Sequence, residues 1–167
     1  MSKSNICRDI HRDSLILDTE TTGLSGFSNA EVIQIGIIDL KGNVICNQLI
    51  KPLRPIPQNV IKIHGITNQE VIDSPSFSEI YEHIKSILEN KVVLSYNAEF
   101  DKTMLNRTCK LYHLPIIFCQ WQCVMKIYQK YLGCTRYRSL PSAVHNAIGD
   151  CYAVLELLRK MKLVNKV

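Results

Sequence analysis

The sequence predicts an α/β protein in which a five-stranded mixed sheet is flanked by helices. Early in the chain, three runs rich in β-branched residues are separated by short polar turns, which is typical of an antiparallel meander. Further along, two short apolar runs alternate with helical patterns of apolar residues, which is typical of parallel strands joined by helices. The two patterns together predict the mixed sheet.

The first three strands are expected close together in the sequence. The apolar run at 15–19 forms the first strand, and a turn containing Gly and Ser at 23–29 follows it. Residues 31–40 alternate β-branched side chains, as a buried strand does. The short turn Lys41-Gly42-Asn43 leads into a third strand at 44–50, so the second and third strands form a hairpin.

Helices dominate the rest of the chain. Gly65 is placed to end a short helix at Gln58–His64. Two capping boxes, Thr67 with Glu70 and Ser76 with Glu79, mark further helix starts. The remaining elements are expected as a helix with one apolar stripe at 77–88, a strand at Lys91–Tyr96, a helix that the Asn97 side chain can cap, a strand at Ile116–Cys119, a helix at Trp121–Tyr131 and a last helix at about Asn146–Lys162.

Composition narrows the class of protein. With 167 residues, of which 46% are hydrophobic, the chain suits a single domain at 14–167 after an N-terminal arm at 1–13. It contains neither an apolar run of about 18 residues nor the apolar core of a secretory signal, so we expect no membrane association. Its seven cysteines are odd in number and include no Cys-x-x-Cys pair, which predicts reduced thiols and a cytoplasmic location.

Positive charge concentrates at the C-terminal end. The net charge is +5, and residues 121–167 carry eight Lys or Arg against two Asp or Glu. Such an asymmetry suits a polyanionic partner lying along this part of the chain. An ordinary solvated helix surface would give the same count, so charge alone leaves both interpretations open.

Four acidic residues stand where a lone carboxylate is unfavourable. Asp18 and Glu20 end the first strand two residues apart, so both point to one face. Asp101 falls in the first turn of its helix, and Asp150 lies on the inward stripe of the last helix. If the four converge, they match two hard divalent cations, Mg²⁺ or Mn²⁺, of the kind that stabilise the attacking and leaving oxygens of a phosphoryl displacement. The alternative is that the acids simply face water.

A histidine precedes the last of these acids. His145 lies five residues before Asp150, which on a helix is about 140° away from the face of that acid. If both serve one site, His145 must therefore lie on the loop before Asn146. An imidazole changes its protonation near neutral pH and can act as a general base. The alternative for His145, and equally for His64, is a surface histidine without a catalytic role.

Three segments occur in order along the chain: Asp18-Thr-Glu20-Thr-Thr-Gly23-Leu24, Asn97-Ala-Glu-Phe-Asp101 and His145-Asn-Ala-Ile-Gly-Asp150. Together they resemble the three motifs of the DEDDh exonucleases, a family that includes the proofreading epsilon subunit of bacterial DNA polymerase III, ribonuclease T and oligoribonuclease. The resemblance spans about residues 14–162. The segment Ile63-His64-Gly65-Ile66-Thr67 also resembles a stretch common in the epsilon-like members.

The resemblance implies a ribonuclease H-like fold and a 3′–5′ exonuclease that releases 5′-mononucleotides from single-stranded DNA or RNA ends. Asp18, Glu20, Asp101 and Asp150 would hold two Mg²⁺ ions, for which Mn²⁺ would substitute, and His145 would be the general base. Substrate contacts are expected from Thr21, Gly23, Leu24, His64, Asn97 and Phe100, although Phe100 is equally well explained as a core residue. Phosphate contacts are expected from Lys126, Lys130, Arg136 and Arg138.

One departure from the family pattern leaves questions open. Family members usually place a further helix before the catalytic His, whereas only four residues separate Leu140 from His145 here. Substrate preference and any polymerase or homodimer partner therefore stay undetermined. Two other functions remain possible for this sequence: a non-catalytic nucleic-acid-binding or polymerase-associated module on the same fold, and a compact α/β protein with incidental surface acids.

Overall fold

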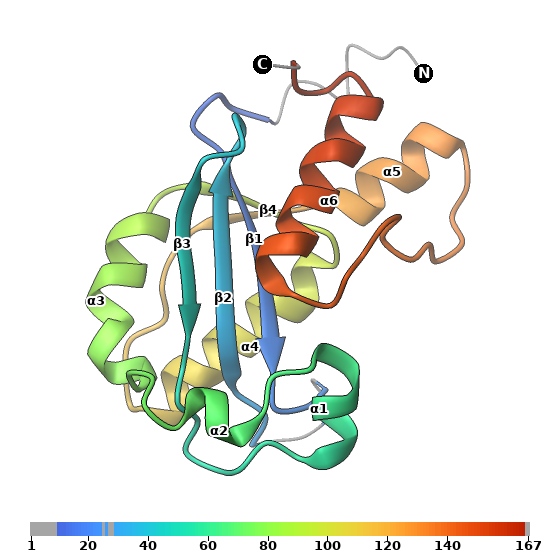
Figure 1. The fold of residues 1–167 in the computed structure, drawn as a ribbon. Helices are drawn as coiled ribbons and strands as arrows, with labels where there is room; N and C mark the ends of the chain where they lie inside the picture. The colour runs from blue at the N-terminus through green and yellow to red at the C-terminus, as the bar shows by residue number, and fades with distance from the viewer. Residues whose placement is uncertain (1–9, 25, 27–28, 166–167) are drawn as a thin grey trace.

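Five strands form the sheet at the centre of the computed structural model (Figure 1), which describes residues 10–24, 26 and 29–165. They are β1 Leu15–Thr21, β2 Val32–Asp39, β3 Val44–Leu49, β4 Val92–Ser95 and β5 Gln120–Cys123. The strand order is β3-β2-β1-β4-β5. The pairs β1–β2 and β2–β3 are antiparallel, whereas β1–β4 and β4–β5 are parallel. The predicted meander followed by parallel strands is thus confirmed.

Two expected segments fall partly outside the described residues. Residues 1–9 of the expected N-terminal arm lie outside them. So do residues 25, 27 and 28 of the expected turn after the first strand.

Six helices occur in the described part of the chain. They are α1 Gln58–His64, α2 Asn68–Val71, α3 Phe77–Leu88, α4 Ala98–Leu111, α5 Val124–Leu132 and α6 Ala147–Lys160. Gly65 ends α1 with a left-handed φ of 78°, and both predicted capping boxes form. Asn97 occupies the N-cap position of α4, but its side chain makes no capping hydrogen bond, so that expectation is wrong.

No helix among the described residues combines the length and the apolar character that crossing a membrane requires.

The fifth strand lies later than its apolar sequence indicated. The expected strand at Ile116–Cys119 does not form: these residues have no regular secondary structure, and Phe118 is 74% exposed. Pairing with β4 selects the following residues, because Val92–Ser95 align in parallel with Gln120–Cys123. As β5 is the sheet edge and only half-buried, its polar residues are tolerated, and α5 consequently begins at Val124 rather than at Trp121.

The two faces of the sheet bury separate cores. Leu15 and Leu17 of β1 pack with α3 and α4 on one face. Ile16, between them in sequence, packs with α6 on the other face, as the alternation of a strand requires. The next residues keep this alternation, so the end of β1 presents alternate side chains to α6 and to α4.

The start of α6 approaches the sheet unusually closely at Gly36 of β2. A Cβ atom at Gly36 would lie 2.7 Å from the carbonyl carbon of Ala147 and 2.8 Å from the amide nitrogen of Ile148. Gly36 is paired with Asp18 across the β1–β2 ladder. The side chain of Gln34 also accepts a hydrogen bond of 3.2 Å from the amide of Ala147. A residue without a side chain therefore brings the first turn of α6 alongside Asp18.

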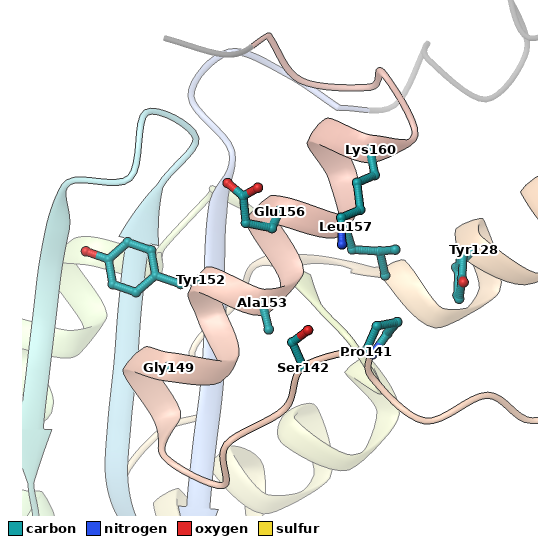
Figure 2. A pocket seen from close by; sticks show the side chains of 9 residues that line it. All are labelled: Tyr128, Pro141, Ser142, Gly149, Tyr152, Ala153, Glu156, Leu157 and Lys160. Carbon is teal, nitrogen blue, oxygen red and sulfur yellow. The ribbon is translucent and has the colours of Figure 1, made fainter.

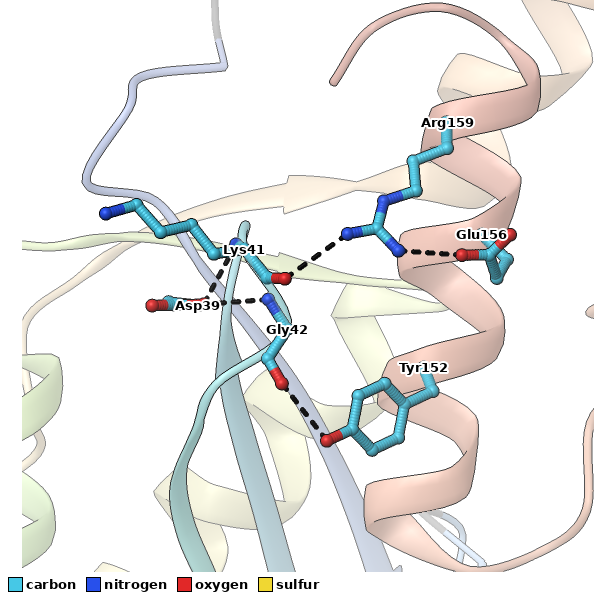
Figure 3. A network of polar contacts seen from close by, with 6 residues as sticks. All are labelled: Asp39, Lys41, Gly42, Tyr152, Glu156 and Arg159. Carbon is cyan, nitrogen blue, oxygen red and sulfur yellow. Dashed lines mark hydrogen bonds and ion pairs between the residues drawn. The ribbon is translucent and has the colours of Figure 1, made fainter. Parts of the chain in front are cut away.

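The later turns of α6 are tied to the β2–β3 hairpin (Figure 3). The hydroxyl of Tyr152 donates to the carbonyl of Gly42 at 3.1 Å. Arg159 donates to the carbonyl of Lys41 at 3.2 Å and pairs with Glu156 at 2.8 Å. The bonds from Tyr152 and Arg159 therefore hold the later turns of α6 against the hairpin.

Substituting Gly36→Ala should destabilise the protein, because the new methyl group would meet backbone atoms of α6 that cannot rotate away. We expect the free energy of unfolding to fall by about 1–3 kcal/mol, the usual cost of overpacking, in a chemical denaturation experiment. Gly26→Ala is the matched control, because nothing lies within 4 Å of a Cβ atom there. Equal stability of the two variants would contradict this account of the helix placement.

Candidate functional site

Three carboxylates meet where the end of β1 faces the first turn of α6. One ligand atom from each of Asp18, Glu20 and Asp150 lies within 4.8 Å of the other two. Asp18 and Glu20 lie two residues apart on β1, and Asp150 comes from α6, whose start is fixed over Gly36. Asp150 is only 8% exposed, as its place on the inward stripe predicts.

Burial and mutual repulsion oppose the ionisation of this cluster. The pKa of Asp18 is well above its usual range, first because of burial and then because of the charges of Asp101, Glu20 and Asp150. The same causes, burial first and then the charges of Asp150 and Asp101, raise the pKa of Glu20 to about 7. A divalent cation between the carboxylates would remove the repulsion.

Asp101 approaches the cluster from the other side of β1. Its Oδ1 accepts a hydrogen bond of 2.8 Å from the hydroxyl of Thr19, which points away from the face of Asp18. Its Oδ2 accepts a hydrogen bond from the hydroxyl of Ser95 at the end of β4. Burial raises the pKa of Asp101 to about 6, whereas the two hydroxyl donors act in the opposite direction. Two hydroxyl groups therefore hold the Asp101 carboxylate where its charge acts on Asp18 and Glu20.

The donor atoms suit a hard divalent cation. The three acids that meet offer only carboxylate oxygens as ligand atoms. Oxygen-only ligation is typical of Mg²⁺, Mn²⁺ and Ca²⁺ sites. The structure thus brings together Asp18, Glu20 and Asp150 as predicted, and places Asp101 close enough for its charge to act on Asp18 and Glu20.

His145 lies on the loop immediately before α6, as its spacing to Asp150 predicted. Its φ is 53°, in the left-handed region, and its side chain is exposed. The amide of Val144 donates to Oδ1 of Asp150 at 2.7 Å, so the loop is anchored to one of the acids. The side chain of Asn146 then caps the helix by accepting a hydrogen bond of 3.2 Å from the amide of Gly149. The tether keeps His145 next to the acidic cluster.

The residues expected to contact substrate surround the same end of β1. The hydroxyl of Thr21 donates to the carbonyl of Gly23 at 2.8 Å, which shapes the turn after the strand, and Leu24 is 66% exposed. His64, at the end of α1, is close enough to the Thr21 backbone and to His145 for both to affect its pKa, which burial chiefly lowers. Figure 1 shows α1 beside the end of β1.

The expected contacts in the second motif divide into two kinds. Asn97 is exposed at the start of α4. Phe100 is half-buried and packs against the core between the sheet, α3 and α4, so the structure places it with the core residues.

The four residues expected to contact phosphates are all exposed. They are Lys126 and Lys130 on α5, and Arg136 and Arg138 in the segment after it.

No helix forms between α5 and α6, consistent with the short sequence before His145. A hollow of about 400 Å³ lies there instead (Figure 2), between Tyr128 of α5, Pro141 and Ser142 of the connecting segment, and the outer face of α6. None of the four acids lines it. The hollow is therefore separate from the acidic cluster, on the opposite side of α6.

Comparison with known proteins decides the family. Residues 15–158 match the RNase T family model, which describes exonucleases. The chain belongs to this exonuclease family. This DEDDh exonuclease is 31% identical to the exonuclease CP81 of Escherichia phage 186. The match covers 87% of this chain and 86% of the phage protein. The DNA polymerase III subunit epsilon of Buchnera aphidicola is 30% identical over 86% of the chain and 70% of the relative.

Solved structures agree with this assignment. Exonuclease X in complex with 5′ overhanging duplex DNA superposes with a TM-score of 0.66 at 25% identity, covering 89% of this chain and 90% of that one. The nuclease domain of 3′hExo, a DEDDh family member bound to rAMP, has a TM-score of 0.66 at 17% identity over 94% and 97% of the two chains. The second likeness confirms the ribonuclease H-like fold.

Sequence reasoning missed the residues that position the acids. Thr19 and Ser95 hold Asp101, Gly36 admits α6, and the Val144 amide anchors Asp150. The alternation of β1 could have pointed to Thr19, which lies between two acids on the opposite face. Ser95 and Gly36 carry no signal in one sequence, because their partners lie on elements far along the chain.

The metal-free protein should become more stable as the pH falls from about 8 to about 5.5. The pKa of Glu20 is about 7 in the folded protein against 4.5 ordinarily, so the folded state binds more protons than the unfolded state in this window. We expect a gain on the order of 1 kcal/mol, or about 2–4 °C in Tm, in a thermal unfolding series with chelator.

Glu20→Gln is the control for this series and should lose part of the pH dependence. Adding Mg²⁺ should abolish the gain in the native protein, because the cation relieves the same repulsion. A Tm that instead falls steadily over this window in the chelated native protein would contradict the electrostatic description of the cluster.

Proposed function

We propose that this chain is a metal-dependent 3′–5′ exonuclease that hydrolyses phosphodiester bonds at the ends of single-stranded DNA or RNA and releases 5′-mononucleotides. The observation that carries the proposal is the meeting of Asp18, Glu20 and Asp150 within 4.8 Å, with Asp101 beside them, in a chain of an exonuclease family. A partly buried cluster of this kind has no structural purpose that apolar residues would not serve better. The unfavourable free energy of bringing these carboxylates together is explained if the cluster holds cations for a reaction.

Each residue has a distinct part in the proposed reaction. Asp18, Glu20, Asp101 and Asp150 would hold two Mg²⁺ ions, for which Mn²⁺ would substitute. Bound there, the ions would supply Lewis-acid stabilisation of the attacking and leaving oxygens in an in-line displacement. His145 would take the proton from the attacking water at an imidazole nitrogen, and its exposure on the loop leaves room for water and substrate beside it.

The end of the substrate would lie along the segment after β1. Thr21, Gly23 and the exposed Leu24 would contact the terminal nucleotide, as would Asn97 and His64. Arg136 and Arg138, together with Lys126 and Lys130, would contact phosphates further along the strand. We also assign the protein to the cytoplasm, which the six free cysteines of the described residues support.

A degradation assay with 5′-labelled oligonucleotides tests the reaction. In Mg²⁺, the protein should produce a ladder that shortens from the 3′ end, and chelator should stop it. Single-stranded DNA, single-stranded RNA and duplex with a mismatched end, compared side by side, should identify the preferred substrate. Binding without shortening would support a non-catalytic module and would contradict the proposed activity.

Two variants separate the proposed roles. Asp18→Asn should reduce kcat by at least about 10³-fold, because a shared metal ligand is lost. It should not lower the Tm of the metal-free protein, since it removes a repelling charge from the cluster. His145→Ala should reduce kcat by about 10²–10⁴-fold while retaining metal binding. Near-native activity of either variant would contradict the role given to that residue.

A further inference from the structure

A short basic and aromatic segment, Arg136-Tyr137-Arg138, lies between α5 and the His145 loop. Its backbone is held from two sides. The side-chain amide of Gln129 on α5 donates to the carbonyl of Arg136 at 2.9 Å. The hydroxyl of Tyr96 lies 2.9 Å from the carbonyl of Arg138 and 3.0 Å from that of Ser139, as a shared donor. The segment is therefore fixed in place although it belongs to no helix or strand.

The side chains of the segment, in contrast, face solvent. Tyr137 is 73% exposed, and both arginines are exposed. Neither arginine forms an ion pair within the described ranges. Residues 121–149 contain no Asp or Glu, so no acid near them in sequence offsets their charge. A fixed backbone thus carries an exposed aromatic residue that stands between two exposed arginines in the sequence.

The anchor residue connects this segment to the acidic cluster. Tyr96 directly follows Ser95, whose hydroxyl holds Asp101. Tyr96 is itself buried, which is the main reason that its pKa is raised to about 12, and Tyr137 is close enough to contribute. Along the chain, the segment leads within seven residues to His145. Tyr96 therefore connects the segment that carries the exposed ring to the end of β4, where Ser95 holds Asp101.

We propose that Tyr137 is a stacking platform for a base of the single strand upstream of its 3′ end. Arg136 and Arg138 contact the adjoining phosphates, and Tyr96 is a positioning residue that holds the backbone of the platform. The occupant is a single-stranded nucleic acid because an aromatic face between cations matches alternating bases and phosphates. The inference rests on the proposed exonuclease function and adds a second contact region to it.

Binding to a fluorescent single-stranded oligothymidylate, measured by anisotropy in the Asp18→Asn background of the whole 167-residue chain, tests the platform without substrate loss. Tyr137→Ala should weaken binding about ten-fold, whereas Tyr137→Phe, which keeps the ring, should bind as before. Phe118→Ala is the matched control, because Phe118 is 74% exposed and lies near Asn90, at the opposite end of β4. Equal losses in Tyr137→Ala and Phe118→Ala, or none in either, would overturn the proposal.

Hydrolysis by the otherwise native chain supplies the second readout. For a long oligonucleotide, Tyr137→Ala should raise KM about ten-fold and leave kcat nearly unchanged, since the platform lies away from the scissile bond. For a dinucleotide, which is too short to reach it, the variant and the native protein should be alike. A fall in kcat with unchanged KM would overturn the platform. Failure of the native protein to hydrolyse any oligonucleotide would instead count against the proposed function, while the anisotropy comparison would still decide the platform.

Tyr96→Phe tests the anchor, because it removes the hydroxyl and keeps the ring. It should raise KM for the long oligonucleotide several-fold and have no further effect in the Tyr137→Ala background, since both changes act through one platform. Additive effects of the two substitutions would overturn the positioning role of Tyr96.

Discussion

Repulsion among partly buried carboxylates is the constraint on which the rest of this structure depends. Asp18, Glu20 and Asp150 share a space in which their ligand atoms lie within 4.8 Å, and the charge of Asp101 acts on Asp18 and Glu20. Left to itself, such a cluster would open or take up protons. The fold prevents opening by fixing each acid through its backbone or through a hydroxyl group. Uptake of protons, or binding of cations, is then the remaining way to relieve the charge.

The architecture supplies these restraints from elements distant in sequence. Strand alternation on β1 sends two acids toward α6 and Thr19 toward α4. Because Gly36 has no side chain, α6 comes close enough to β2 to place Asp150 beside Asp18 and Glu20. The loop before α6 uses the Val144 amide to bind Asp150 and so carries His145 to the same place. One restraint therefore serves two purposes, because the hydrogen bond that holds an acid also places the proposed base.

Much of the fold could be predicted because its signals are local. Periodicity and turn residues located the meander and the last helix, and Gly65 located the end of α1. The inward position of Asp150 followed from the same periodicity. The fifth strand could not be located in this way, since pairing with β4 outweighed the apolar character of Ile116–Cys119. The role of Ser95 could not be predicted either, because its hydroxyl meets Asp101 only when β4 and α4 are packed together.

Counting bound Mn²⁺ ions by electron paramagnetic resonance tests the central claim most directly. We expect two ions per chain in the native protein and a loss of at least one in Asp18→Asn, with the protein still folded. Absence of Mn²⁺ binding at millimolar concentration, or equal binding by the native protein and Asp18→Asn, would contradict the claim that the acids are held together to bind cations.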